Sequence, residues 1–450
     1  MKLIRSPWMS AITALVIGVS IGIASSVHAE RVETRLPVDD VRMFSQVLER
    51  IKQAYVEDVE DSELIENAIE GMLSGLDPHS DYLTPDDFKD LRESTRGEFG
   101  GLGIEISLDE TGFVRVVAPI DDTPAYRAGM QSGDLITQID DTPVKGMSIG
   151  DAVNLMRGRP GTEVTLTVAR EGESQPLEIE ITRDIIQVTS IRNRMIEPGV
   201  GYIRISQFQE RTGQDFVEAM ESLREENEGA LDGLVLDLRN NPGGVLQASV
   251  DVVDALISQG LIVYTEGRLP NSASEFEANA DDPSEGVNLV VLINGGSASA
   301  SEIVAGAIQD HRRGIIMGTR SFGKGSVQTI LPLNDNHAIK LTTARYYTPD
   351  GRSIQAQGIE PDIEVRPGKL TQENGNPYYS EANLAGHLTN GQVDETDAET
   401  DEQADDVESD STSESTSEDE AEADNELIND YQLYQAVTLL KGMRVLNAAR

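Results

Sequence analysis

The sequence predicts a multi-domain α/β protein, and three observations lead to this fold class. From about residue 200 onward, short apolar runs alternate with amphipathic stretches, as strands and helices do in a largely parallel sheet. Residues 98–183 instead contain short β-rich runs between glycine, proline and aspartate turns. Amphipathic helical patterns lie near both ends of the 450-residue chain. This length suffices for two or three domains, each with its own core.

Composition argues against several classes of function. The chain has 79 acidic and 36 basic residues, a net charge of −43, and no cysteine. Nucleic acids and anionic membrane surfaces are disfavoured as partners, because clustered lysine and arginine bind phosphate groups. Without cysteine there are no disulfides, thiolate metal sites or cysteine nucleophiles. Residues 394–426 hold 17 of the acidic side chains and no basic one, so much of the charge is local.

The N-terminus has the pattern of a secretory signal peptide over 1–29. Lys2 and Arg5 precede an apolar run over 8–27, and small residues stand before the expected cleavage site at Glu30. An uncleaved anchor is the alternative, because the run is close to the minimum length that spans a bilayer. Serines and glycines within the run favour cleavage, so we expect an exported, soluble mature protein.

Helical segments are expected on both sides of the central domains. In the N-terminal helical region, 30–97, apolar residues recur every three or four positions around Val41–Ile51 and again around Leu64–Met72. Such helices need a partner surface, either the core of the same chain or a second subunit. Residues 366–425 are predicted to be an acidic disordered linker, and 426–450 a C-terminal helix that serves in assembly or docking.

The elements between these helical segments follow in order. The β-rich module, 98–183, contains one helix, Ser148–Met156. Its expected strands are Gly103–Ser107, Phe113–Val117, Leu135–Ile139, Val164–Ala169 and Leu177–Thr182. The α/β core, 184–365, alternates strands and helices. Its expected strands are Gly201–Ile205, Leu234–Leu238, Leu289–Ile293 and Gly314–Gly318, and its expected helices are Gly213–Arg224, Leu246–Ile257 and Ser299–Asp310.

The segment Asn294–Glu302 follows a buried strand and begins a helix. Serines alternate with alanines at a position where unpaired backbone N–H groups and the helix dipole favour negative charge. A serine placed there is suited to act as a nucleophile, because its alkoxide and a developing oxyanion are stabilised together. Helix capping is the alternative, since serine is a preferred N-cap and Glu302 suits the first turn.

The glycine-rich segment Gly318–Ser326 allows three interpretations. A phosphate loop is rejected because Gly325 displaces the serine or threonine required after Lys324. An S-x-x-K motif through Ser321 and Lys324 needs a helical turn, which the glycines disfavour. In the third interpretation, Lys324 is the base for a serine elsewhere, is oriented by Gln328, and must be buried enough to be neutral. A solvent-exposed lysine in a loop is the plain alternative.

Histidine is too scarce to favour the usual serine–histidine pair. The chain past the expected cleavage site has only four histidines, with no G-x-S-x-G elbow and no H-E-x-x-H pair. A serine with a histidine base is therefore the weaker mechanism.

Two glycine-rich turns are candidates for binding a peptide backbone. Asp237–Gly244 closes a strand, and Gly243 and Gly244 permit the close approach that an oxyanion donor requires, although a tight strand-to-helix turn needs them equally. Gly101–Ile104 enters the β-rich module, where consecutive N–H groups can bind a terminal carboxylate. Four-residue glycine patterns are common, so this second signal is weak alone.

Together these motifs resemble the carboxy-terminal processing peptidases, a tail-specific family of exported serine proteases with an inserted PDZ domain. The resemblance runs from about Val41 to Val365. It implies that Ser299 is the nucleophile, Lys324 the general base and Gln328 its orienting residue. It also implies that Gly243 or Gly244 supplies one oxyanion donor and the N–H of Ala300 the other. Further segments similar to family signatures are Arg345–Ile354 and Gly358–Asp362, and supporting positions are Glu302, Asp310 and Ser321.

The resemblance also implies a function. It suggests a periplasmic endopeptidase that binds substrate C-termini through its PDZ domain, with no metal or organic cofactor, and that forms a homo-oligomer. The carboxylate would be bound at Leu102, Gly103 and Ile104, with Val153 and Met156 lining the groove. The alternatives are an inert PDZ adaptor that assembles envelope complexes, and an enzyme that stays latent until an activating adaptor protein binds.

Overall fold

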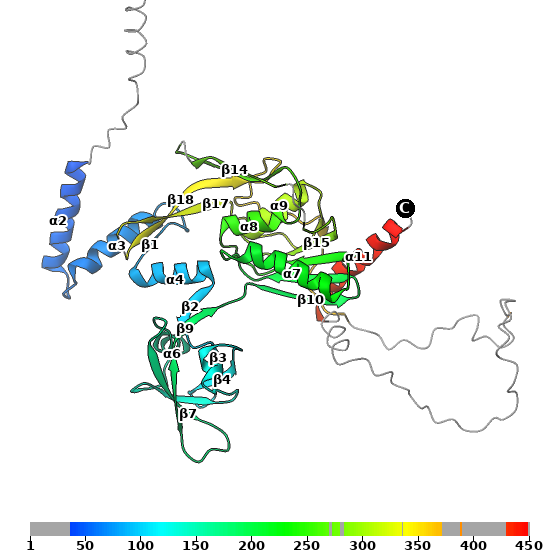
Figure 1. Ribbon diagram of the computed structural model, residues 1–450. Coiled ribbons are helices and arrows are strands. Elements are labelled where there is room, and N and C mark those ends of the chain that lie inside the picture. Colours follow the sequence, from blue (N-terminus) through cyan, green and yellow to red (C-terminus); the bar gives the residue numbers. More distant parts are fainter. Residues whose placement is uncertain are drawn as a thin grey trace, which may run out of the picture. The chain divides into compact units, whose positions relative to one another are not determined.

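The computed structural model describes residues 37–269, 272–279, 283–334, 336–370, 388 and 429–448. The expected signal peptide, 1–29, and nearly all of the expected linker, 366–425, lie outside the described residues. The chain divides into two compact units, 1–72 and 73–450, which are considered separately below (Figure 1). In the described part of the chain, no helix combines the length and the apolarity needed to cross a bilayer.

The first unit contains the two helices expected near the N-terminus. They are α2 (Val38–Ala54) and most of α3 (Asp61–Ser74). No residue of α2 is buried, and its apolar side chains Val41, Phe44 and Val47 are about half exposed. The amphipathic pattern is therefore correctly interpreted as a helix, but its apolar face is not covered within this unit.

The α/β core of the second unit is a six-stranded sheet whose central strands are parallel. Its order is β10 (Ile191–Glu197), β11 (Val200–Ile205), β12 (Gly233–Asp237), β15 (Asn288–Ile293), β16 (Ile315–Gly318) and β19 (Ile363–Glu364), with only β10 antiparallel. The helices α7 (Thr212–Glu226), α8 (Leu246–Asp254) and α9 (Ala300–Asp310) join the strands. Leu234 and Leu236 pack into one apolar cluster with these helices, whereas Val235 packs into a second cluster on the other face. Both faces are thus covered, as continuous apolar strands predict.

The second face is covered by the C-terminal helix α11 (Tyr431–Ala448), so of its two expected roles, assembly or docking, the structure shows docking on its own chain. Leu433, Val437 and Leu440 are almost fully buried against the sheet of their own chain. Asp430 caps the helix, since its carboxylate accepts a hydrogen bond from the N–H of Leu433. The helix pattern was right. Its partner is intramolecular, because the strands it covers are apolar on both faces.

A buried charge cluster fixes α11 to the end of β12. Arg239 bonds to Asp430 at 2.7 Å and to Asp237 at 2.6 Å, and Asp237 is fully buried. Tyr202 donates a further hydrogen bond to Asp237 at 2.8 Å. Burial raises the pKa of Asp430, but the hydrogen bonds and charge of Arg239 outweigh it, so the pKa lies below its ordinary value. Asp430 is therefore ionised when the helix is docked.

We expect Asp430→Asn to destabilise the second unit by about 1–3 kcal/mol, because Arg239 loses a charged hydrogen-bond partner. The pKa of Asp430 is lower in the folded state, so its contribution is present above the unfolded pKa and is lost as the pH falls through the folded value. The measurement is urea unfolding at neutral and acidic pH. As a control, Glu364→Gln in the exposed pair with Arg366 should change stability by less than about 0.5 kcal/mol. Equal effects of the two variants would contradict a stabilising role for the buried pair of Arg239 and Asp430.

A second sheet lies beside α9 and is built around the long strand β18 (Ala338–Tyr347). Its neighbours are β1 (Asp81–Leu83), β13 (Leu261–Gly267) and β17 (Ser326–Pro332), all antiparallel to it, and β14 (Ser274–Glu277) pairs with β13. Helix α4 (Pro85–Arg96) follows β1. Because β18 pairs with both β1 and β17, it brings residues near position 80 next to the glycine-rich segment around position 324.

The β-rich module has the strand order β3 (Ile104–Leu108), β4 (Val114–Pro119), β5 (Leu135–Ile139), β7 (Glu163–Ala169) and β8 (Leu177–Thr182). A short strand β6 (Thr142–Pro143) pairs with β5, and two helices, α5 (Pro124–Arg127) and α6 (Ile149–Met156), complete the module. All five expected strands are present. The module is entered and left through one antiparallel pair, β2 (Glu98–Gly101) with β9 (Asp184–Gln187), which the strand pattern did not predict.

Candidate active site

Ser299 stands at the turn between β15 and α9 in a strained backbone conformation. Its φ of 57° and ψ of −113° are unusual for a residue other than glycine. Two hydrogen bonds join this turn to the segment after β12. The hydroxyl of Ser297 donates to the carbonyl of Leu238 at 2.8 Å, and the N–H of Ala298 donates to the carbonyl of Asn241 at 2.9 Å. The neighbouring strands therefore fix the half-buried Ser299 at the N-terminus of a helix, where negative charge is favoured.

Glu302 joins the serine segment to the lysine segment. Its carboxylate is fully buried and accepts hydrogen bonds from the N–H of Ser299 at 2.8 Å and the N–H of Lys324 at 2.8 Å. Ser321 and the N–H of Gly323 donate two further bonds, both at 2.6 Å. Burial raises the pKa of Glu302 above its ordinary value, against the lowering effect of these bonds. One side chain thus holds together two segments that are 22 residues apart.

Lys324 and Gln328 lie where the glycine-rich segment enters β17. Lys324 is half-buried, and its pKa is lowered first by burial and then by the positive charge of Lys340. The charges of Asp77 and Glu302 act in the opposite direction. Gln328 donates from its amide nitrogen to Ser326 at 3.0 Å and to Thr342 at 3.3 Å. The partial burial and lowered pKa are what a neutral lysine base needs.

The turn after β12 approaches the nucleophile closely. A side chain at Gly243, whose φ is 99°, would lie 2.7 Å from the carbonyl oxygen of Ala298 and 2.7 Å from the Cβ of Ser299. The N–H of Gly243 already donates to the side chain of Asn241 at 2.9 Å. No hydrogen bond from the N–H groups of Gly244 or Ala300 occurs within the described residues. Of the two glycines, Gly244 is therefore the one whose backbone N–H is available to donate to an oxyanion.

One cavity of about 610 Å³ unites these groups. Its lining includes Ser299, Ala300, Lys324, Gln328, Gly243 and Gly244, so the catalytic and oxyanion residues predicted from sequence share a single hollow. Lys340 and Tyr346 also line it, and sequence reasoning missed both. The phenol of Tyr346 donates to the carbonyl of Lys324. Nothing in local spacing marks either residue, because both reach the site through strand pairing in β18.

Comparison with known proteins identifies the family of the chain. Residues 199–365 match peptidase family S41, 115–170 match a PDZ domain, and 20–86 match the N-terminal domain of the activating protease CtpB. A carboxy-terminal-processing protease of Bartonella bacilliformis is 50% identical over 347 residues, which cover 77% of this chain and 80% of that protein. The chain belongs to peptidase family S41.

Two further relatives of this S41 peptidase span most of the same region. The carboxy-terminal processing protease CtpA of Bacillus subtilis is 34% identical over 327 residues, covering 72% of this chain and 68% of that protein. The solved structure of a photosystem II D1 C-terminal processing protease is 31% identical, with a TM-score of 0.42 and coverage of 72% and 92%. The acidic segment and α11 lie beyond the residues that match the peptidase family.

The expected binding residues in the PDZ domain of this S41 peptidase differ in how deeply they are buried. Leu102 and Met156 are nearly fully buried in the core of the domain, whereas Ile104 and Val153 are half-buried. Gly103, with a φ of 75°, accepts hydrogen bonds at its carbonyl from Thr123 and Ile120. The side chains of Leu102 and Met156 are thus core residues in this structure, and the expectation that Met156 lines an open groove needs that correction.

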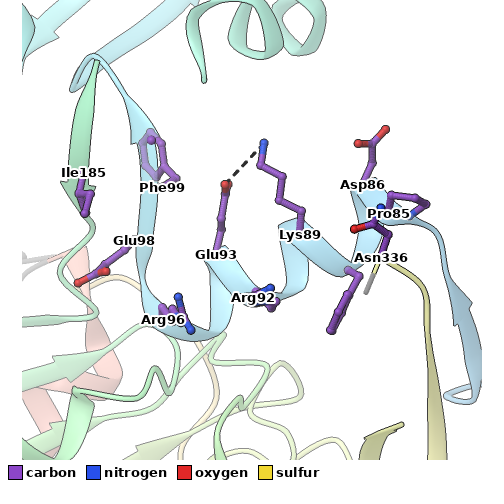
Figure 2. Close-up of a pocket in the computed structure, with 12 residues that line it drawn as sticks. Pro85, Asp86, Lys89, Arg92, Glu93, Arg96, Glu98, Phe99, Ile185 and Asn336 are labelled. Carbon is purple, nitrogen blue, oxygen red and sulfur yellow. Dashed lines mark ion pairs between the residues drawn. The ribbon is translucent and has the colours of Figure 1, made fainter. Parts of the chain in front are cut away.

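Helix α4 lines both the cavity that holds Ser299 and a second pocket of about 530 Å³, whose lining Figure 2 shows. Lys89 and Glu93 project from one side of α4 and form an ion pair at 3.7 Å, whereas Arg92 and Arg96 lie on the other side. Arg92 and Arg96 also line the active-site cavity. Residues of α4 therefore line both cavities of the S41 peptidase.

Proposed function

We propose that this S41 peptidase is a periplasmic serine endopeptidase that recognises substrate C-termini through its PDZ domain and cleaves through a Ser299–Lys324 acyl-enzyme mechanism. The observation that carries the proposal is the buried Glu302 carboxylate, which bonds to the N–H of both residues and so holds them around one cavity. The lowered pKa of Lys324 supports its role as a neutral base.

The mechanism conserves protons at each step. Neutral Lys324 takes the proton of the Ser299 hydroxyl as its oxygen attacks the peptide carbonyl. The N–H groups of Ala300 and Gly244 stabilise the oxyanion, and protonated Lys324 then gives the proton to the leaving amine. Neutral Lys324 then takes a proton from water as its oxygen attacks the ester, and returns that proton to the departing oxygen of Ser299, which releases the acid product and regenerates both residues. Gln328 orients the lysine from β17.

The substrate is proposed to dock its free carboxylate on the N–H groups of Leu102, Gly103 and Ile104, at the entry to β3. The chain would then extend beside α6, where Val153 is half-buried. Main-chain pairing with a strand edge accepts many sequences, so the side chains of the last substrate residues would set the preference.

Location and assembly belong to the same proposal. The pattern of 1–29 favours export with cleavage of a signal peptide, and an anchored form is the alternative. The uncovered apolar face of α2 supports a homo-oligomer. We also propose the domain limits 30–97, 98–183 and 184–365 for the helical, PDZ and protease parts.

The test is cleavage of an unstructured polypeptide that ends in apolar residues. We expect the wild-type protein to degrade it and Ser299→Ala to leave it intact. The same polypeptide with an amidated C-terminus should be cleaved about tenfold more slowly, because one charge-assisted set of hydrogen bonds is lost. Equal cleavage by Ser299→Ala would contradict the nucleophile. Equal rates on the acid and the amide would contradict recognition of the carboxylate.

No cleavage by any version would instead favour the inert adaptor or the latent enzyme. An acylating probe separates these two outcomes, because a latent enzyme labels Ser299 slowly alone and faster with its activating partner, whereas an inert adaptor forms no adduct.

A further inference from the structure

Lys340 places a second ammonium group in the active-site cavity. It lies on β18, where its backbone pairs with Ile330 on β17 and with Asp81 on β1. Its side chain is about 29% exposed, and its Nζ lies 3.4 Å from the carboxylate of Asp81. Lys324 lies just before β17 and lines the same cavity. Two strand pairings therefore hold Lys340 at the cavity that Lys324 also lines, where its positive charge disfavours a proton on Lys324.

Asp77 lies at the end of a hydrogen-bonded chain that leads to Gln328. Its carboxylate accepts bonds from the N–H groups of His79 and Ser80, at 2.8 and 3.0 Å, and from the hydroxyl of Ser80 at 2.7 Å. The hydroxyl of Thr342 donates a fourth bond at 3.1 Å. Although burial raises the pKa of Asp77, these bonds outweigh it, so the pKa lies below the ordinary value and the group is ionised at neutral pH.

This chain dictates how the amide of Gln328 is oriented. An ionised carboxylate only accepts hydrogen bonds, so the single proton of the Thr342 hydroxyl is committed to Asp77. The Thr342 oxygen can then only accept from Gln328, which requires the amide nitrogen to face it, at 3.3 Å. The carbonyl oxygen of Gln328 is consequently turned away from Thr342, and the lysine base requires just such an acceptor for its Nζ.

The charged and titratable groups around Lys324 are few. Asp77 and Glu302 favour its protonated form, and Lys340 opposes it. The pKa of His79 is lowered, first by burial and then by Lys324, so His79 is neutral near neutral pH. The phenol of Tyr346 is uncharged, since burial raises its pKa well above the ordinary value. From α4, the exposed side chains of Arg92 and Arg96 line the same cavity.

We propose that Asp77 and Lys340 are positioning residues for the base Lys324: Asp77 orients Gln328 through Thr342, and the Lys340 ammonium disfavours a proton on Lys324. This inference rests on the proposed Ser299–Lys324 mechanism. It adds two residues, Lys340 on β18 and Asp77 in the loop after α3, whose effect on the reaction is exerted through Lys324 and Gln328.

Lys340→Met tests the charge of the second lysine. Without that charge the pKa of Lys324 rises, so the acid limb of kcat/KM, followed from about pH 5 to about pH 10, should move up by about 0.5–1 unit. The plateau at high pH should stay close to wild type, whereas a merely structural defect lowers the plateau and leaves the limb in place. Lys340→Arg keeps the charge and should leave the limb unshifted. An unshifted limb in Lys340→Met overturns the role of Lys340.

Asp77→Asn should move the same limb in the opposite direction, because it removes a negative charge that raises the pKa of Lys324. Thr342→Val breaks the hydrogen-bonded chain without changing charge, so we expect the limb to stay while the plateau falls about tenfold. A shift of the Asp77→Asn limb to higher pH, or an unchanged plateau in Thr342→Val, would overturn the role of Asp77.

A second measurement needs no protease activity and so separates this inference from the proposed function. Competitive labelling with acetic anhydride, read by peptide mass spectrometry, reports the pKa of Lys324 from the reactivity of its neutral form. The expected result is a raised pKa in Lys340→Met and a lowered one in Asp77→Asn. If the pKa of Lys324 is unchanged in both variants, the inference is refuted even in an active protease. If the pKa rises in Lys340→Met and falls in Asp77→Asn, the inference is supported even when no substrate is cleaved.

Discussion

Lys324→Arg is expected to reduce kcat/KM by about 10³-fold or more while the protein stays folded. Arginine keeps the positive charge and much of the length of the side chain, but its guanidinium stays protonated and cannot accept the proton of Ser299. Raising the pH should not restore activity, because the guanidinium does not titrate in the accessible range. The measurement is kcat/KM across pH, with thermal unfolding of the same samples.

Arg320→Lys is the matched control, since it makes the reverse exchange in the same glycine-rich segment. Arg320 is more than half exposed and pairs with Glu360 at 3.1 Å, away from the catalytic cavity. We expect its kcat/KM to remain within about twofold of wild type. Activity of Lys324→Arg within tenfold of this control would refute a lysine base.

Gly243→Ala should lower kcat by about 10²-fold, the second large effect expected. The new Cβ would lie 2.7 Å from the carbonyl oxygen of Ala298 and 3.0 Å from the N–H nitrogen of Ala300, and both are backbone atoms that cannot swing aside. The φ of 99° adds strain for any residue with a side chain. The nucleophile turn must therefore shift, and displacing a reacting group by about 1 Å costs about this factor.

The control for Gly243→Ala is Gly295→Ala in the same nucleophile turn. A Cβ at Gly295 would meet no atom within 4 Å, and its backbone lies outside the left-handed region. We expect Gly295→Ala to keep wild-type activity and Gly243→Ala to lose it with a stability cost of about 1–3 kcal/mol. Full activity in Gly243→Ala would show that the oxyanion turn tolerates displacement.

The sequence predicts the parts of the site that local patterns encode. Ser299 and Lys324 stand out because a helix begins at one and a glycine-rich turn surrounds the other, and both patterns lie within ten residues. Strand periodicity likewise predicts the parallel sheet, because buried strands are continuously apolar. These features depend on residues that are close together in the sequence, so they can be predicted before the fold is known.

Long-range pairing produces what the sequence could not predict. Asp77 and Thr342 are 265 residues apart and meet because β1 pairs with β18, while β17 pairs with β18 and brings Gln328 to Thr342. Similarly, Arg239 pairs with Asp430 across 191 residues, and this pairing, which sequence could not predict, identifies the surface on which the C-terminal helix docks as the sheet of its own chain. The side-chain oxygen of Asn241 accepts a hydrogen bond from the N–H of Gly243, which leaves the N–H of Gly244 as the proposed oxyanion donor. None of these partners is marked by spacing.

Covalent labelling of Ser299 tests the central claim most directly. The protein would be incubated at neutral pH with an acylating substrate analogue, and the adduct located by peptide mass spectrometry in wild type, Lys324→Ala and Ser299→Ala. The account predicts one acyl group on Ser299 in wild type, formed at least about 10²-fold more slowly in Lys324→Ala and absent in Ser299→Ala. Equal labelling rates with and without Lys324, or an adduct on another residue, would contradict it.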